Sequence, residues 1–142
     1  MKKIALISCC KKKNINKCQA RDMYQSTLFK LSYLFAKKIG CDDIYVLSAK
    51  YGLLNEEEII EPYDETLNRK NITERRNWAD KVIAQLKKNL EIDIKNDEFI
   101  ILTGKKYYED IIPYLQKYRL PLGNLPIGMR LNFLKNSCED LK

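Results

Sequence analysis

Three short apolar segments, at 3–8, 43–48 and 98–103, constrain the fold of this chain more than any other feature. Their sequences are KIALIS, DIYVLS and EFIILT, and apolar runs of this length, rich in β-formers, predict buried strands. Two longer segments, 24–39 and 74–90, carry apolar residues at helical spacing instead. Strands that alternate with helices predict a parallel sheet with helices packed on both of its faces.

The other segments fit the same domain. Residues 49–68 form a polar stretch with a glycine and a proline, and here we expect a long ordered loop with one helical turn at most. Residues 105–118 have the helical pattern, although Pro113 would kink or delay the helix. The Pro- and Gly-rich stretch that follows suggests a short fourth strand, before a last helix at 129–141. We therefore expect a single α/β domain over 1–142, with three layers and a mainly parallel sheet of about four strands.

The positive charge of the chain is concentrated near its start. The net charge is +7, but residues 1–38 alone contain ten Lys and Arg and one acid, while residues 39–142 have a slight acidic excess. Half of these basic residues fall in 9–23, which we expect to be a loop. A positive field of this kind attracts phosphate, nucleic acid or another anion. The alternative is a solvated loop that only aids solubility.

Composition excludes several kinds of site. The chain has no histidine, which excludes catalytic triads that use histidine and the zinc motifs that contain it. Its five cysteines are scattered and contain no CxxC pair, so we expect reduced thiols in a cytoplasmic protein, with no metal and no cofactor. No apolar run approaches the length of a membrane span, and the N-terminus lacks the features of a signal peptide. We therefore expect no membrane partner.

Small polar residues and lysines follow each of the three expected strands. Because the carboxyl ends of parallel strands meet at one edge of a sheet, these residues should converge on one crevice suited to an anionic ligand. Tyr24 and Ser26 start the first helix, and their hydroxyls would either face this crevice or serve in capping and packing. The residues expected to bind the ligand are Ser8, Lys11, Lys12, Lys13, Tyr24, Ser26, Ser48, Lys50, Tyr51, Gly52, Tyr63, Thr103, Gly104 and Lys105. The alternative is that strand ends simply carry turn residues and solubilising lysines.

Three residues are candidates for chemistry. Glu61 and Asp64 flank a Pro-Tyr pair in the long loop and would suit general acid–base work, unless they only form salt bridges with lysines. Cys9 lies beside lysines at the end of the first strand, where positive charge favours a nucleophilic thiol, although small cysteines are more often just buried. Trp78 lies on an apolar helix face and belongs in the core. Tyr51, Tyr63 and Tyr107 would either stack on a base or pack at the rim.

Six segments occur in an order that resembles a bacterial and phage family of unknown function. They are ISCCKKK, MYQSTLF, VLSAKYGLL, EPYDETL, NWADKV and LTGKKYYE, and they cover about 4–130. The same skeleton is similar, more distantly, to the YaaA peroxide-stress family, which has an ISPAK-like strand end, an LSGLYGxL turn, a PY pair and a Trp-containing helix. The matching positions are Ser8, Lys11, Tyr24, Ser48, Tyr51, Gly52, Pro62 and Tyr63.

The YaaA resemblance implies a positively charged cleft, DNA binding and a link to oxidative stress. This chain departs from that family in its short length, in Cys9-Cys10 where YaaA has Pro-Ala, and in SAKYG where YaaA has SGLYG. The strand end with cysteine and lysine, followed by a Tyr-x-Ser segment, is also similar to the lysine-transfer domain of archaeosine synthases, which implies chemistry on a deazaguanine base.

Two functions from different classes follow from these patterns. The first is binding of nucleic acid, or of a nucleotide or nucleobase ligand, with lysines on phosphate and tyrosines stacked on a base. The second is an enzyme that acts on a nucleotide or nucleobase, such as a glycosidic-bond hydrolase or transferase. A third possibility is an acidic protein partner. The sequence does not give the oligomeric state.

Overall fold

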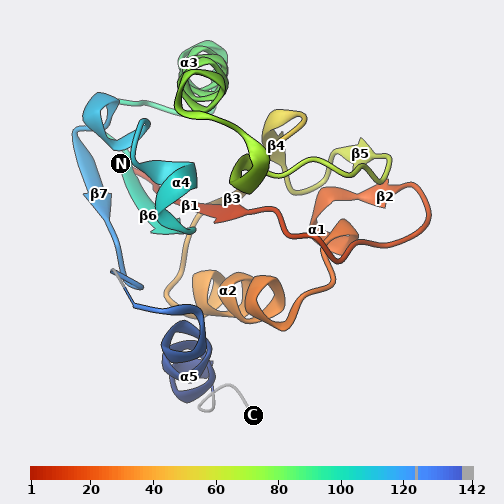
Figure 1. Cartoon of the computed structure of the whole chain (residues 1–142). Coiled ribbons are helices and arrows are strands. Elements are labelled where there is room, and N and C mark those ends of the chain that lie inside the picture. The colour runs from red at the N-terminus through yellow and green to blue at the C-terminus, as the bar shows by residue number, and fades with distance from the viewer. Residues whose placement is uncertain (124, 139–142) are drawn as a thin grey trace.

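The protein is built on a five-stranded sheet with the order β4-β3-β1-β6-β7 (Figure 1). The computed structural model describes residues 1–123 and 125–138. Four strands run parallel and β4 runs antiparallel to β3, so the sheet is mainly parallel, as the sequence predicts. The strands are β1 (Lys3–Ser8), β3 (Asp43–Ser48), β4 (Gly52–Asn55), β6 (Glu98–Leu102) and β7 (Lys117–Arg119).

The three apolar segments form the centre of this sheet. In β1, residues 4–7 are at most 1% exposed, because helices cover both faces and leave no side of the strand to water. Parallel pairing places Ser8 beside Leu47 of β3 and Ile7 beside Leu102 of β6. The carboxyl ends of the three strands therefore lie next to one another, as the sequence predicts.

Helices cover the two faces of the sheet unequally (Figure 1). On one face lie α2 (Thr27–Lys38) and α5 (Ile127–Cys138), which contact each other through an edge-on pair of Phe35 and Phe133. On the other lie α3 (Ile72–Lys88) and the short α4 (Lys105–Tyr108). This gives the expected three layers, and one hydrophobic cluster runs through all of them, from Ile4 to Cys138. In the described ranges no helix is long and apolar enough to cross a membrane.

The basic segment after β1 has more structure than the loop we expected. It contains a two-residue strand, β2 (Cys18–Gln19), followed by one helical turn, α1 (Ala20–Met23). This turn packs against the chain beyond β4, where β2 pairs antiparallel with β5 (Ile59–Ile60). The backbone amide of Ala20 also donates to the carbonyl of Glu58, at 2.8 Å. These contacts join residues about 40 positions apart, so no local sequence pattern predicts them.

The prediction of a loop throughout 49–68 is wrong in part, because β4 and β5 lie within it. After β3 the chain turns back at once, and Gly52 makes the turn with a positive φ of 77°. The amide side chain of Gln85, from α3, is seated against this turn. It accepts a hydrogen bond from the amide of Leu53 at 2.8 Å and donates one to the carbonyl of Tyr51 at 3.1 Å. A tertiary contact thus stabilises the hairpin of β3 and β4, and β4 carries no strong strand signal in the sequence.

Two helix boundaries also differ from the prediction. Helix α3 begins at Ile72, two residues before the helical segment expected at 74–90, because Asn71 caps it and forms a capping box with Glu74. The helix expected at 105–118 stops after α4, and a 3-10 turn, η2 (Ile112–Tyr114), follows it. Pro113 in this turn cannot donate the amide hydrogen bond that a longer helix requires.

The fourth strand, β7, therefore starts two residues earlier than expected and pairs in parallel with β6. The last helix, α5, begins at Ile127 and is described as far as Cys138. Its expected end at 139–141 lies outside the described residues.

The turn at Gly52 gives the first testable prediction. A β-carbon at Gly52 would lie 2.3 Å from Oε1 of Gln85, whereas a β-carbon at Gly40, which also has a positive φ, would have nothing within 4 Å. We expect Gly40→Ala to lower the free energy of unfolding by about 1–2 kcal/mol through backbone strain alone. We expect Gly52→Ala to lower it by about 1–3 kcal/mol more, because the turn must also move away from Gln85. Urea denaturation measures both, and equal losses would contradict the role of Gln85.

Candidate functional site

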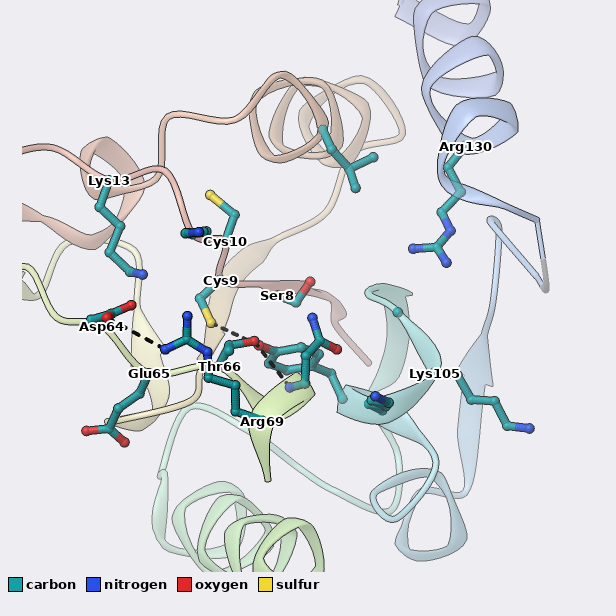
Figure 2. A pocket seen from close by; sticks show the side chains of 16 residues that line it. Ser8, Cys9, Cys10, Lys13, Asp64, Glu65, Thr66, Arg69, Lys105 and Arg130 are labelled. Carbon is teal, nitrogen blue, oxygen red and sulfur yellow. Dashed lines mark hydrogen bonds and ion pairs between the residues drawn. The ribbon is translucent and has the colours of Figure 1, made fainter. Parts of the chain in front are cut away.

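A cavity of about 480 Å³ opens at the carboxyl edge of the sheet, between the ends of β1 and β6 (Figure 2). The chain leaves β1 toward β3 on one side and later returns to pair β6 on the other side, so the strand order reverses here. Connections diverge at such a point, and open α/β sheets usually bind their ligands in the crevice that remains. The walls are the segments after β1 and β6, the 64–69 segment that includes η1 (Leu67–Arg69), and Arg130 of α5.

The floor of the cavity is the end of β1. Ser8 and Cys9, labelled in Figure 2, line it together with Tyr107 from α4. The sulfur of Cys9 accepts the amide hydrogen of Ala49 at 3.4 Å and lies 3.4 Å from the hydroxyl of Tyr107. That hydroxyl accepts the amide of Leu67, also at 3.4 Å, so its own proton remains available to the sulfur. The thiol is thus held in a fixed position at the bottom of the cavity.

Positive side chains outnumber negative ones around the cavity by six to two. The acids are both engaged, because Asp64 lies 3.7 Å from Arg69 and Glu65 lies 3.8 Å from Lys70, which is outside the lining. Within residues 1–123 and 125–138, the other five cations of the lining form no ion pair. They are Lys11, Lys13, Lys105, Lys106 and Arg130. The cavity therefore presents unneutralised positive charge from three separate parts of the chain.

The three consecutive lysines after β1 do not act alike. An antiparallel bridge joins Lys13 to Tyr24, and the amide of Gln25 donates to the carbonyl of Lys12 at 2.9 Å. The backbone bends at Lys11 and is held by the bridge at Lys13, and the side chains of Lys11 and Lys13 line the cavity whereas that of Lys12 does not. The ammonium of Lys13 lies 4.4 Å from the centre of the Tyr63 ring, a cation–π distance.

Behind this wall lies a buried chain of hydroxyl groups. The oxygen of Ser48, fully buried, accepts the amides of Lys50 and Tyr51 at 3.2 and 2.9 Å. Its proton goes to the hydroxyl of Tyr63 at 2.7 Å, which is in turn 2.7 Å from the hydroxyl of Tyr24. Ser48, Tyr24 and Tyr63, all predicted to bind ligand, thus support the cavity from behind and are not part of its lining.

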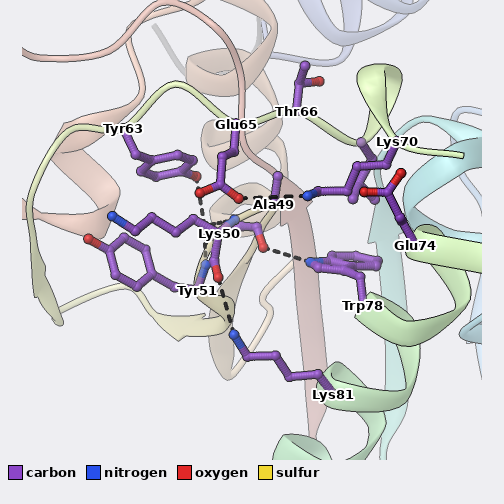
Figure 3. A network of polar contacts seen from close by, with 12 residues as sticks. Ala49, Lys50, Tyr51, Tyr63, Glu65, Thr66, Lys70, Glu74, Trp78 and Lys81 are labelled. Atoms are coloured by element: carbon purple, nitrogen blue, oxygen red, sulfur yellow. Dashed lines mark hydrogen bonds and ion pairs between the residues drawn. The ribbon is translucent and has the colours of Figure 1, made fainter.

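Trp78 links this network to the helices (Figure 3). It is 7% exposed, which confirms that it belongs to the core. Its indole nitrogen donates to the carbonyl of Ser48 at 2.8 Å, and its ring meets that of Tyr107 edge-on, with centres 5.6 Å apart. One side chain of α3 thereby holds the end of β3 and the phenol beneath the cavity.

Burial keeps the tyrosines near the cavity protonated. Desolvation raises the pKa values of Tyr24, Tyr63 and Tyr107 above the usual range, and the nearby Cys9 side chain adds to each rise. At neutral pH their hydroxyls are therefore hydrogen-bond donors or acceptors and not anionic bases.

Several predicted residues lie outside the cavity. Lys50 is exposed, and its ammonium lies 5.3 Å from the centre of the Tyr51 ring. Tyr51 and Gly52 belong to the hairpin turn, and Gly52 acts through its backbone conformation. The side chain of Glu61 is exposed, while its carbonyl accepts the hydroxyl of Tyr51 at 3.5 Å. Of the predicted carboxylates, only Asp64 lines the cavity.

Two further predicted residues have structural roles next to the site. The hydroxyl of Ser26 accepts the amide of Phe29 at 3.1 Å and caps α2, which is the alternative that the sequence left open. Thr103 is buried, and its hydroxyl donates to the carbonyl of Gly104 at 3.1 Å. Both line a small hollow of about 40 Å³ that shares Ser8 and Cys9 with the main cavity.

Five of the predicted binding residues do meet in the cavity, and the structure adds others. The predicted ones are Ser8, Lys11, Lys13, Gly104 and Lys105, joined by the candidate catalytic residues Cys9 and Asp64. The residues that sequence reasoning missed are Cys10, Leu28, Glu65, Thr66, Asn68, Arg69, Lys106 and Arg130. Lys106 and the 65–69 segment adjoin predicted residues, so a wider window would have found them. No sequence signal points to Arg130, because α5 reaches the site only through the tertiary fold.

The fold and the site define a class of protein. It is an α/β protein whose mainly parallel sheet has helices on both faces and a basic crevice where the strand order reverses. Among the residues that the structure describes, no group of three His, Cys, Asp or Glu side chains is placed to hold a metal ion. Residues 4–136 match the model of a family of unknown function, DUF6884, and the chain belongs to this family. No curated protein matches the sequence.

The buried tyrosines predict how stability changes at alkaline pH. Their pKa values are raised in the folded protein, so the stability they contribute is complete below about pH 10, the ordinary tyrosine value, and is lost as the pH rises above it. We expect Tyr24→Phe to reduce the slope of unfolding free energy against pH between about 10 and 12. Tyr118→Phe, at an exposed tyrosine, is the matched control. Urea titrations at each pH measure the slope, and equal slopes in both variants would contradict the prediction.

Proposed function

We propose that the cavity binds a phosphorylated small molecule of nucleotide type. The observation that carries this proposal is the convergence of five cations without an ion-pair partner, in the described part of the chain, on one concave space. Unpaired positive side chains repel one another, and a phosphoryl group relieves that repulsion while it accepts several charge-assisted hydrogen bonds.

The shape of the site favours a small ligand over a polymer. Its volume of about 480 Å³ falls within the range usual for small-molecule sites, and walls from four parts of the chain surround it. A groove that tracks a nucleic-acid backbone would instead extend along one face. The shape therefore favours a small ligand over the DNA that the YaaA resemblance implies. The binding experiment below includes DNA as the alternative.

The neutral part of the lining suits a sugar and a base. Ser8, Thr66 and Asn68 offer hydroxyl and amide groups, and Leu28 and Tyr107 offer apolar surface. This mixture of a few polar groups with apolar walls is typical of sites that orient a small ligand. The Tyr63 ring is partly covered by the ammonium of Lys13, so base stacking on that ring is not part of the proposal.

Neighbouring lysines provide a sharp test of this proposal. Lys11 lines the cavity and Lys12 does not, although substitution of either removes one positive charge from the same segment. Calorimetric titration with the four ribonucleoside monophosphates should show binding to the wild type that Lys11→Ala weakens about tenfold, as expected for loss of one charged hydrogen bond. Lys12→Ala should bind like the wild type.

Other outcomes are informative. Equal weakening by Lys11→Ala and Lys12→Ala would indicate general attraction by the basic segment and would contradict a defined site. Binding only to single-stranded DNA, with loss in moderate salt, would replace the small ligand with a nucleic acid.

A second candidate is an enzyme that acts on this ligand, and the position of Cys9 favours it. Its thiol lies at the floor of the cavity, below any ligand that the cations hold. In a glycosidic-bond transferase or hydrolase, the sulfur would bond to the anomeric carbon while the bond from that carbon to the base breaks. The base nitrogen would keep the electron pair and take the thiol proton. Water or an acceptor alcohol would then displace the sulfur.

Paired cysteine variants test this candidate. We expect Cys9→Ser to bind ribonucleoside monophosphates but to release no free base. Cys10→Ser, at the adjacent and partly exposed thiol, should release base like the wild type. Chromatography of the reaction mixture measures the released base. Equal release by Cys9→Ser and the wild type would exclude a nucleophilic role for this thiol.

A further inference from the structure

The charges around the cavity are separated between two walls (Figure 2). Lys105, Lys106 and Arg130 come from α4 and α5, and none of them forms an ion pair within the described ranges. The opposite wall contains the two acids, Asp64 and Glu65. One wall is thus purely cationic, which we call the α4–α5 wall, and the other, the 64–69 wall, has mixed charge.

We propose that the α4–α5 wall binds the phosphoryl group of the ligand, and that Asp64 on the opposite wall binds vicinal hydroxyls of its sugar. This orientation rests on the proposed function, since it assumes that the cavity takes a phosphorylated ligand. It assigns the ligand class more narrowly, as a phosphorylated ribose compound.

Arg130 is positioned for a phosphoryl group before any ligand arrives. Its Nε donates to the carbonyl of Leu125 at 2.7 Å, which fixes the guanidinium plane. A β-carbon placed on Gly104 would have Nη1 of Arg130 as its nearest neighbour, at 3.6 Å. The guanidinium therefore lies against a residue without a side chain at the end of β6, and an anion can approach both. A planar guanidinium with free Nη groups can bind two phosphoryl oxygens at once.

Asp64, on the 64–69 wall, disfavours a phosphoryl group and suits hydroxyl groups instead. Its side chain is 81% exposed, and its ion pair with Nη1 of Arg69 is long at 3.7 Å. A carboxylate repels a phosphoryl group, so the acid disfavours an anion on this wall. Its two oxygens are acceptors only and suit a pair of neighbouring hydroxyl donors, as in ribose. Thr66 and Asn68 follow on the same wall and add neutral polar groups.

Simple sugar phosphates test the orientation without knowledge of the base. The probes are inorganic phosphate, ribose 5-phosphate and 2-deoxyribose 5-phosphate, measured by calorimetry on the full chain. Arg130→Ala should weaken all three about tenfold or more, whereas Lys135→Ala, an exposed lysine on the same helix, should not. Melting curves of each variant check that it remains folded.

Asp64→Asn tests the other wall. We expect it to leave inorganic phosphate binding within about twofold of the wild type and to abolish the preference for ribose over 2-deoxyribose. Glu61→Gln, which removes an exposed carboxylate from the same loop but outside the cavity, should keep that preference.

The outcomes distinguish the orientation from the function it rests on. If phosphate compounds bind, but Arg130→Ala has no more effect than Lys135→Ala, the orientation is overturned and the proposed function stands. A gain in phosphate affinity of more than about tenfold in Asp64→Asn would place the phosphate beside Arg69 and also overturn it. If the wild type binds neither the sugar phosphates nor the ribonucleoside monophosphates, the proposed function fails and the orientation fails with it.

Discussion

Parallel pairing of β1 between β3 and β6 is the constraint on which the rest of this structure depends. Ladder hydrogen bonds fix the register, so that Ser8 lies beside Leu47 and Ile7 beside Leu102. Since parallel strands need long connections, the segments after β1 and β6 must leave the same edge in different directions. The cavity is the space between them, and its floor is the end of the central strand.

Buried polar groups then keep the walls of this space in place. Ser48 is fully buried and makes three hydrogen bonds through its hydroxyl. Its carbonyl accepts a fourth hydrogen bond, from the indole nitrogen of Trp78. In a low dielectric a hydroxyl without partners is costly, so a satisfied network of this kind favours one arrangement of the chain over others. It connects α3, the end of β3 and the segment around Tyr63, whose ring lies 4.4 Å from the ammonium of Lys13.

The cations show why charge along the sequence is an incomplete guide to charge in space. The basic excess lies in the first 38 residues, yet only Lys11 and Lys13 of that region contribute charge to the cavity. The remaining cations come from η1, α4 and α5, in a part of the chain with a slight acidic excess. Some acids are paired away from the cavity, such as Glu98 with Arg119 and Glu56 with Arg21.

Hydrophobic patterning in the sequence was sufficient to locate the three central strands, the two long helices and the edge of the sheet where the cavity opens. The reason is that these elements are nearly continuous or periodic in apolar residues, and that parallel strands share one carboxyl edge. Local patterns were insufficient for β4, whose turn depends on Gln85, and for the early end of α4.

The side chains that line the cavity divide in the same way. The sequence by itself determined that Ser8, Cys9, Lys11 and Gly104 lie at strand ends, because the chain cannot place them elsewhere once the strands form. Only the tertiary structure decided that Lys11 lines the cavity while Lys12 does not, since the bridge of Lys13 to Tyr24 and the bend at Lys11 place this segment. It also decided that Arg130 completes the site, because α5 packs across α2 through contacts between residues about a hundred positions apart.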